Sequence, residues 1–151
     1  MSMEREEKDL DIDGERRNRY LDKMDTLEER LGDVERWLED DDDTLLENKE
    51  RRLALYKAFQ EVVEVVADVC AMYLSDATHG IGDDSENIQK AAGRLFSEDI
   101  GRTLVKANGL RNRVVHDYNG FSDGKALESM RKHIDALQQF EEEVERWIES
   151  R

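Results

Sequence analysis

The sequence predicts an all-α fold, a single bundle of about five helices with a four-helix up-and-down core. Its 151 residues include no proline and few glycines, and Leu, Ala, Glu, Lys and Arg dominate, which favours helix over strand. Apolar residues recur at steps of three and four, the period of an amphipathic helix. We place one domain at residues 13–151, behind residues 1–12, which lack apolar periodicity and are expected to fray.

The first two predicted helices differ in the width of their apolar faces. The first carries one narrow stripe: Leu21, Met24, Leu27, Leu31, Val34 and Leu38. After the acidic run at 39–43, Thr44 and Glu47 fit a capping box that would start the second helix. The second helix has the wider face, so we expect it at the centre of the bundle. Its apolar members are Leu55, Tyr56, Phe59, Val62, Val63, Val66, Val69, Cys70 and Tyr73.

Three further helices complete the predicted bundle. A loop at 79–85 contains two glycines, and Ser85 is the expected cap of a short helix that extends to Phe96. A fourth helix runs from about Asp99 to Tyr118 and ends at Asn119-Gly120, because both residues tolerate the left-handed conformation. The last helix starts at Ser122 or Asp123. Its inner stripe is Leu127, Met130, Ile134, Leu137, Phe140, Val144 and Trp147.

The formal net charge is −15, and the acidic residues are spread along the whole chain apart from one block at 39–43. One hypothesis is a halophile's cytosol, where salt near 1 M shortens the Debye length to about 3 Å and screens the self-repulsion. The alternative is an ordinary acidic interaction protein. No apolar stretch is long enough to span a bilayer, and the first residues are charged rather than signal-like, so we expect a cytoplasmic location.

Most signatures of enzymes are absent from the sequence. It has no Gly-rich phosphate loop, no pair of histidines at metal-binding spacing and no cysteine cluster, so we expect neither metal nor cofactor. The single Cys70 lies in an apolar run and is interpreted as a core residue. His79, in a loop, and His133, on the last helix, are interpreted as surface residues.

The fourth helix departs from the rest of the chain in its charge. No Asp or Glu occurs from Ile100 to His116, although 38 of 151 residues are acidic. The same window contains four cations, Arg102, Lys106, Arg111 and Arg113. The helix dipole favours cations near a C-terminus by only about 0.3–1 kcal/mol each, and core burial also removes acids. A positive island on an acidic protein nevertheless indicates an anionic ligand, with RNA or a nucleotide as the best fit.

The spacing within this helix points to a dimer. Asn108, Asn112 and His116 are four residues apart and are predicted to form one polar stripe. Arg111 precedes His116 by five positions, which places the two side chains about 140° apart around the helix. Two copies of the helix across a two-fold axis can direct both residues at one cleft. A glycine inside a helix, such as Gly109, lowers the stability of the helix by about 1 kcal/mol relative to alanine. Because it has no side chain, a partner helix or a phosphate backbone can approach closely at this position.

The segment Arg111-Asn112-Arg113-Val114-Val115-His116-Asp117-Tyr118 carries a family resemblance. Arg-x4-His followed by x-Tyr, at the end of a late helix in a short helical chain, resembles the HEPN superfamily and particularly its HepT-type toxins. The order of the helices agrees over roughly residues 15 to 150, and outside the motif the similarity is one of pattern. The long charged first helix and the acidity resemble lineage-specific additions.

The resemblance implies a metal-independent endoribonuclease toxin that acts as a homodimer, with the motifs of both protomers facing one cleft. Arg111 and His116 would be catalytic, and Asn112 would be the supporting polar residue. The polar and basic residues of the acid-free window are the expected contacts to RNA phosphates: Arg102, Lys106, Asn108 and Arg113. Attack by the neighbouring 2′-hydroxyl would leave a cyclic phosphate, so the reaction requires no protein nucleophile.

The resemblance also implies a role for Tyr118. In HepT-type systems the tyrosine of this motif is where a partner nucleotidyltransferase antitoxin adds AMP. The added charge and bulk beside Arg111 and His116 would block RNA. The alternative is that Tyr118 only packs the end of the helix.

Two other readings of the sequence remain open. One is a non-catalytic HEPN module that binds nucleotide or serves as a scaffold for a nucleotidyltransferase. The other is a helical interaction protein in which Arg111 and His116 form salt bridges with the abundant carboxylates. The complete Arg, Asn, His and Tyr set favours the ribonuclease, whereas the acidity argues against RNA binding, because phosphate contacts weaken steeply with salt.

Overall fold

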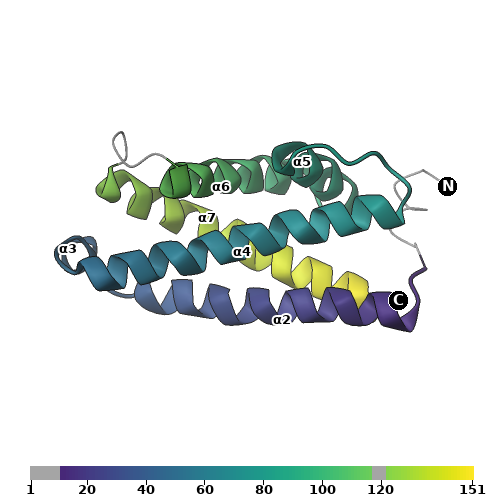
Figure 1. Ribbon diagram of the computed structural model, residues 1–151, viewed down its shortest axis with the longest axis horizontal. Helices are drawn as coiled ribbons and strands as arrows, with labels where there is room; N and C mark the ends of the chain where they lie inside the picture. Colours follow the sequence, from purple (N-terminus) through teal and green to yellow (C-terminus); the bar gives the residue numbers. More distant parts are fainter. Residues whose placement is uncertain (1–10, 117–121) are drawn as a thin grey trace.

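The computed structural model describes residues 11–116 and 122–151, and the side chain of His116 lies outside the described set. Within these ranges the chain forms six helices and no strand. They are α2 (Gly14–Trp37), α3 (Asp42–Glu47), α4 (Lys49–Asp76), α5 (Asp84–Leu95), α6 (Glu98–His116) and α7 (Asp123–Glu149). Figure 1 shows that the four long helices, α2, α4, α6 and α7, run alternately up and down. The predicted all-α bundle with a four-helix core is therefore confirmed.

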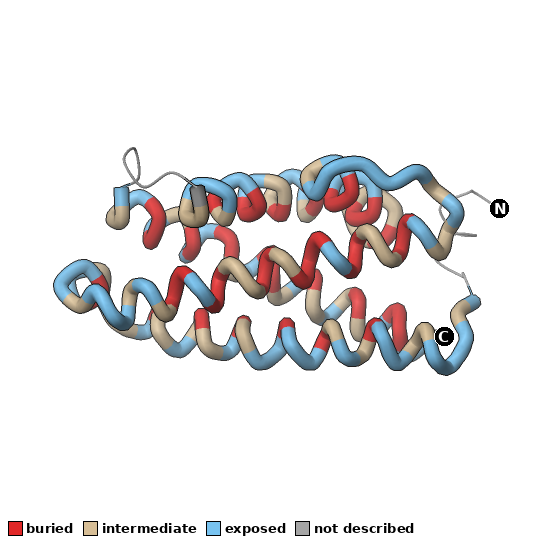
Figure 2. Tube along the Cα trace, in the orientation of Figure 1, coloured by how far each residue is buried: buried red, intermediate tan, exposed pale blue. Residues whose placement is uncertain are grey.

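Helix α4 is the centre of the bundle, as its wide apolar face predicts. It packs against α2, α3, α5 and α6. Val62, Val63, Val65 and Val66 are all buried, so α4 meets neighbours on more than one side. Figure 2 shows the buried positions of all the long helices turned toward one interior. Cys70 is buried in that interior, as expected of a core residue.

The helix starts differ from the prediction at two caps. Asp41, not Thr44, caps α3: its Oδ1 accepts a hydrogen bond of 2.8 Å from the Thr44 backbone N–H. Asn48 then ends α3 and caps α4 through a 3.1 Å bond from the Arg51 N–H, so the predicted second helix is two elements. Part of the acidic run is consequently helical, because acids at a helix start suit the positive end of its dipole.

The α5 cap is Asp83 rather than Ser85, since Asp83 Oδ1 accepts from the Glu86 N–H at 2.9 Å. Ser85 is thereby free to bond elsewhere. Ser122, one of the two predicted starts of the last helix, caps α7 through a bond from the Lys125 N–H. The expected end of the fourth helix at Asn119-Gly120 lies outside the described residues.

His133 is not a surface residue, contrary to the prediction. Only 8% of it is exposed, and its Nδ1 is buried and finds no hydrogen-bond partner in the part of the chain that the structure describes. Burial lowers its pKa, and Lys106 and Lys132 lower it further. The inner stripe of α7 is wider than the seven predicted apolar positions, and the imidazole occupies part of it.

The first helix is an integral part of the bundle, because α2 packs on both α4 and α7. Tyr20 is fully buried and meets Trp147 edge to face, with ring centroids 5.2 Å apart. Leu21, in the predicted stripe, is only partly buried beside it. Among the described residues, no helix is long and apolar enough to cross a membrane.

Candidate functional site

Helix α6 turns its acid-free segment toward both the core and the solvent. Leu104, Ala107 and Leu110 are buried and fix the orientation of the helix. The exposed side carries four residues that fall within about 60° of one another at 100° per residue: Arg102, Lys106, Gly109 and Arg113. A Cβ added at Gly109 would meet no atom within 4 Å, so this side of α6 is open.

Arg111 lies on a different side of α6, about 160° around the helix from Arg113. Its side chain is only 14% exposed and reaches the start of α5, where Nη2 donates to Asp84 Oδ2 at 2.9 Å. Nη1 lies 3.8 Å from Glu64 Oε1 of α4. The guanidinium is therefore held where α4, α5 and α6 meet, between two carboxylates.

Asn108 supports Arg111 from one turn earlier. It is 2% exposed, and its Oδ1 accepts a 3.2 Å hydrogen bond from Arg111 Nη2. Its Nδ2 donates to Ser85 Oγ at 3.2 Å, which links α6 to the first turn of α5. Asn108 and Asn112, two positions of the predicted stripe, lie about 40° apart around α6 but differ in exposure, since Asn108 is buried and Asn112 is exposed.

The loop before α5 is fixed by Asn87, which is 2% exposed. Its amide accepts from the Gly82 N–H at 2.8 Å and donates to the Gly82 carbonyl at 3.1 Å. This two-way bond sets where α5 begins and hence where Asp84 meets Arg111. The sequence reasoning missed Asp84, Glu64 and Asn87, because 27 and 47 residues separate the two carboxylates from Arg111.

The predicted RNA-binding cations are only partly available in one protomer. Arg102 forms ion pairs with Asp99 and, at 3.9 Å, with Glu98. Lys106 and Arg113 are exposed and form no ion pair within the described residues. The structure thus brings Arg111 and Asn108 together and turns Arg102, Lys106 and Arg113 away from them. The side chain of His116 and all of Tyr118 lie outside the described residues.

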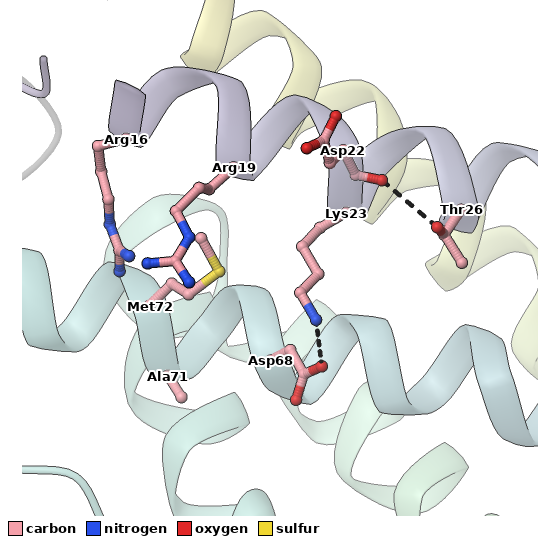
Figure 3. A pocket seen from close by; sticks show the side chains of 8 residues that line it. All are labelled: Arg16, Arg19, Asp22, Lys23, Thr26, Asp68, Ala71 and Met72. Carbon is pink, nitrogen blue, oxygen red and sulfur yellow. Dashed lines mark hydrogen bonds and ion pairs between the residues drawn. The ribbon is translucent and has the colours of Figure 1, made fainter. Parts of the chain in front are cut away.

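A groove lies between α2 and α4, and none of these residues lines it. Its volume is about 590 Å³, and its cations are Arg16, Arg19 and Lys23. Figure 3 shows Lys23 directed at Asp68, at 2.8 Å, and Arg16 is bound at 2.8 Å to Asp76. Because carboxylates already neutralise two of the three cations, the groove offers little net attraction for an anion. Within the described residues no cluster of three His, Cys, Asp or Glu side chains could hold a metal ion.

The bundle, with an Arg-x4-His sequence closing a late helix, defines a HEPN-type helical protein. A family model described as "Ribonuclease HepT-like" matches residues 27–144. The chain belongs to this HepT-like ribonuclease family, which confirms the resemblance drawn from its motif.

Individual proteins agree with this assignment. A protein of Archaeoglobus fulgidus described as "Putative RNase" is 32% identical over 105 residues, which cover 69% of this chain and 74% of that protein. A second protein of that organism, with the same description, is 29% identical over 139 residues, covering 89% and 96%. Among solved structures, a tri-AMPylated HEPN toxin of Shewanella oneidensis, in complex with an MNT antitoxin, superposes with a TM-score of 0.75. It is 17% identical and covers 84% of this chain and 96% of its own, so it supports the fold.

Proposed function

We propose that this chain is the endoribonuclease toxin of a toxin–antitoxin pair and that it cleaves RNA in a cleft shared by two protomers. Membership of a ribonuclease family supports the class of activity. The observation that carries the proposal is the placement of Arg111, a cation held at the meeting point of three helices in a segment without acids.

In this proposal Arg111 binds the scissile phosphate, and its fixed positive charge stabilises the charge that develops on the phosphate oxygens. The 2′-oxygen forms a bond to phosphorus while the bond from phosphorus to the 5′-oxygen breaks. One His116 accepts the proton of the 2′-hydroxyl, and the His116 of the other protomer donates a proton to the leaving 5′-oxygen. The products are a 2′,3′-cyclic phosphate and a 5′-hydroxyl, and Asn112 supports the substrate. The nucleophile belongs to the RNA, so no step requires a metal.

A homodimer through the exposed side of α6 is part of the same proposal. Arg111 and the cations Lys106 and Arg113 point to different sides of α6, so one protomer does not offer them to a single phosphate. Two protomers related by a two-fold axis would line one cleft with the cations of both, and an RNA backbone would neutralise them. The open space at Gly109 supports a close approach at the crossing point.

Tyr118 is the proposed off-switch, modified with AMP by a nucleotidyltransferase antitoxin. The Shewanella oneidensis HEPN toxin is tri-AMPylated and in complex with an MNT antitoxin, which supports the same kind of partner here. Tyr118 is two residues beyond His116 in the sequence, so we expect added phosphates to bring negative charge and bulk close to the proposed catalytic histidine.

The alternative function is a non-catalytic HEPN module that binds nucleotide or serves as a scaffold for a nucleotidyltransferase. The ion pairing of Arg111 favours it, since the pair gives the residue a structural role that needs no substrate. Cleavage of RNA separates the two proposals.

The experiment incubates total RNA with the purified protein, with and without EDTA, beside the variants Arg111→Ala and His116→Ala. The expected result is EDTA-resistant cleavage that falls at least 100-fold in both variants, while His79→Ala, a loop histidine on another part of the chain, cleaves like the parent. Equal background cleavage in all samples would refute the endoribonuclease and leave the non-catalytic module.

A further inference from the structure

The guanidinium of Arg111 already donates hydrogen bonds within the protein, and a ligand that binds it must compete with these partners. Both hydrogens of Nη2 are used, one by Asp84 Oδ2 at 2.9 Å and one by Asn108 Oδ1 at 3.2 Å. The Nε atom is buried and has no hydrogen-bond partner in the described ranges 11–116 and 122–151. Only Nη1 remains, and Glu64 stands 3.8 Å from it. A phosphate that approaches Arg111 therefore meets two carboxylates around one cation.

The two carboxylates are not equivalent. Glu64 Oε1 also accepts a 2.9 Å hydrogen bond from Gln60 Nε2, within α4, and its distance from Arg111 is too long for a hydrogen bond. Asp84 bonds Arg111 directly, and its side chain is 51% exposed. Carboxylate and phosphate oxygens accept from guanidinium in the same geometry. The Asp84 carboxylate thus occupies the position on Arg111 Nη2 that a phosphate oxygen would take.

Asp84 can leave this position at small cost. It lies in the first turn of α5, where the helix dipole stabilises a negative charge whether or not Arg111 is bound. Its side chain is 51% exposed, so water can solvate the carboxylate when it is not bound to Arg111. Asn108 remains bonded to both Ser85 and Arg111, so the guanidinium keeps its location after Asp84 is released.

We infer that Asp84 is a built-in competitor for the RNA phosphate: its carboxylate binds Arg111 in the empty site and is displaced when RNA binds. The inference rests on the proposed function, in which Arg111 takes the phosphate. It adds a residue that sets affinity for RNA without contacting the reacting atoms.

The test measures binding of a fluorescent 2′-O-methyl oligoribonucleotide, which lacks the attacking hydroxyl and is not cleaved, at one fixed ionic strength. The variants are Asp84→Asn, Arg111→Ala and their combination. Glu86→Gln is the matched control, because it removes one negative charge from the same turn of α5, whereas the ion pairs of Arg111 within the described residues are with Asp84 and Glu64. Unchanged circular dichroism establishes that each variant is folded, and Asp84→Ser provides a second substitution at the same position.

Asp84→Asn is expected to tighten binding about three- to tenfold relative to the parent, and Glu86→Gln less than twofold. In the Arg111→Ala background, Asp84→Asn should have no effect beyond that of Glu86→Gln. Binding that is unchanged, absent or weakened in Asp84→Asn overturns the inference. So does a gain that persists without Arg111, because it would be a general effect of charge.

Cleavage of unmodified RNA by the same proteins separates this inference from the proposed function. If the variants show the expected pattern of binding but the parent protein never cleaves RNA, Asp84 is still the competitor and the endoribonuclease proposal is refuted. If the parent protein cleaves RNA but Asp84→Asn and Glu86→Gln bind the oligonucleotide equally, the endoribonuclease proposal stands and the inference about Asp84 is overturned.

Discussion

At the scale of single residues, Asn108 and His133 are both buried polar groups, but they differ in whether their polar atoms have hydrogen-bond partners within the described part of the chain. The amide of Asn108 donates to Ser85 and accepts from Arg111, so it fixes the position of the Arg111 guanidinium. His133 is also buried, but its Nδ1 has no hydrogen-bond partner among the described residues. A buried polar atom without a hydrogen bond costs about 1–3 kcal/mol, so the first residue supports the fold and the second weakens it.

Replacing His133 with Leu should therefore stabilise the protein. The gain in the free energy of unfolding at pH 7.5 is expected to be about 1 kcal/mol. The pKa of His133 is lowered in the folded state, so the unfolded chain binds the proton more readily and the parent loses stability as the pH falls below about 6.5. The advantage of His133→Leu should thus be larger at pH 5 than at pH 7.5. Urea unfolding at both values measures it, and an advantage that shrinks at pH 5 would contradict the assignment.

At the scale of helices, the seam between α2 and α7 gathers carboxylates. Glu141 Oε2 is buried there without a hydrogen-bond partner. The pKa of Glu141 is raised to about 7, first by burial and then by the negative charges of Glu145, Glu28, Glu35 and Glu142, in that order. The loss of folding free energy caused by these carboxylates depends on pH, because Glu141 must ionise beside other negative charges when the pH rises.

Glu141→Gln is expected to stabilise the protein at pH 8 and to leave its stability unchanged near pH 4.5. A raised pKa means that the folded state holds the proton, and this contribution to stability is lost as the pH rises through about 7. Because the carboxyl is partly exposed and solvent screens it, the gain at pH 8 should be about 1–2 kcal/mol rather than the full shift. Thermal unfolding at the two pH values measures this difference. Asp135→Asn, an exposed acid on the same helix, should show no such dependence on pH.

Helix periodicity explains which elements could be predicted from the sequence. Apolar steps of three and four located all of the long helices, since burial of one face dominates their stability. The break at Asn48 was missed because Asp41, Thr44 and Asn48 compete as caps, and only the packed structure decides among them. The site was predicted as a helix segment with its Arg-x4-His motif. Its carboxylate partners were not, because α4 and α5 bring Glu64 and Asp84 to Arg111 only through the fold.

At the scale of the whole molecule, the net charge of −15 is distributed over the surface of a small bundle. Several cations are consumed by ion pairs with these acids, as in Arg102 with Asp99 and Arg131 with Asp42. Salt weakens such exposed pairs but also screens the far more numerous repulsions between acids. Because acids outnumber cations in this chain, we expect the screening of repulsion between acids to outweigh the weakening of the ion pairs.

We expect the melting temperature to rise between 0.05 M and 2 M KCl. The gain should appear mostly below 0.5 M, where the Debye length changes most. A melting temperature that is flat or falls would contradict the halophile hypothesis and favour an acidic interaction surface. Light scattering at the same salt concentrations measures the oligomeric state, and a monomer at both ends of the range would contradict the shared cleft.

The most direct test of the central claim is the chemistry of the cut ends of a defined RNA. The proposed reaction of Arg111 and His116 predicts fragments that end in a 2′,3′-cyclic phosphate and begin with a 5′-hydroxyl, formed in EDTA and absent with His116→Ala. An RNA with a 2′-deoxy sugar at the cleaved position should remain intact. Fragments with a 3′-hydroxyl, or cleavage that survives the loss of His116, would contradict the claim.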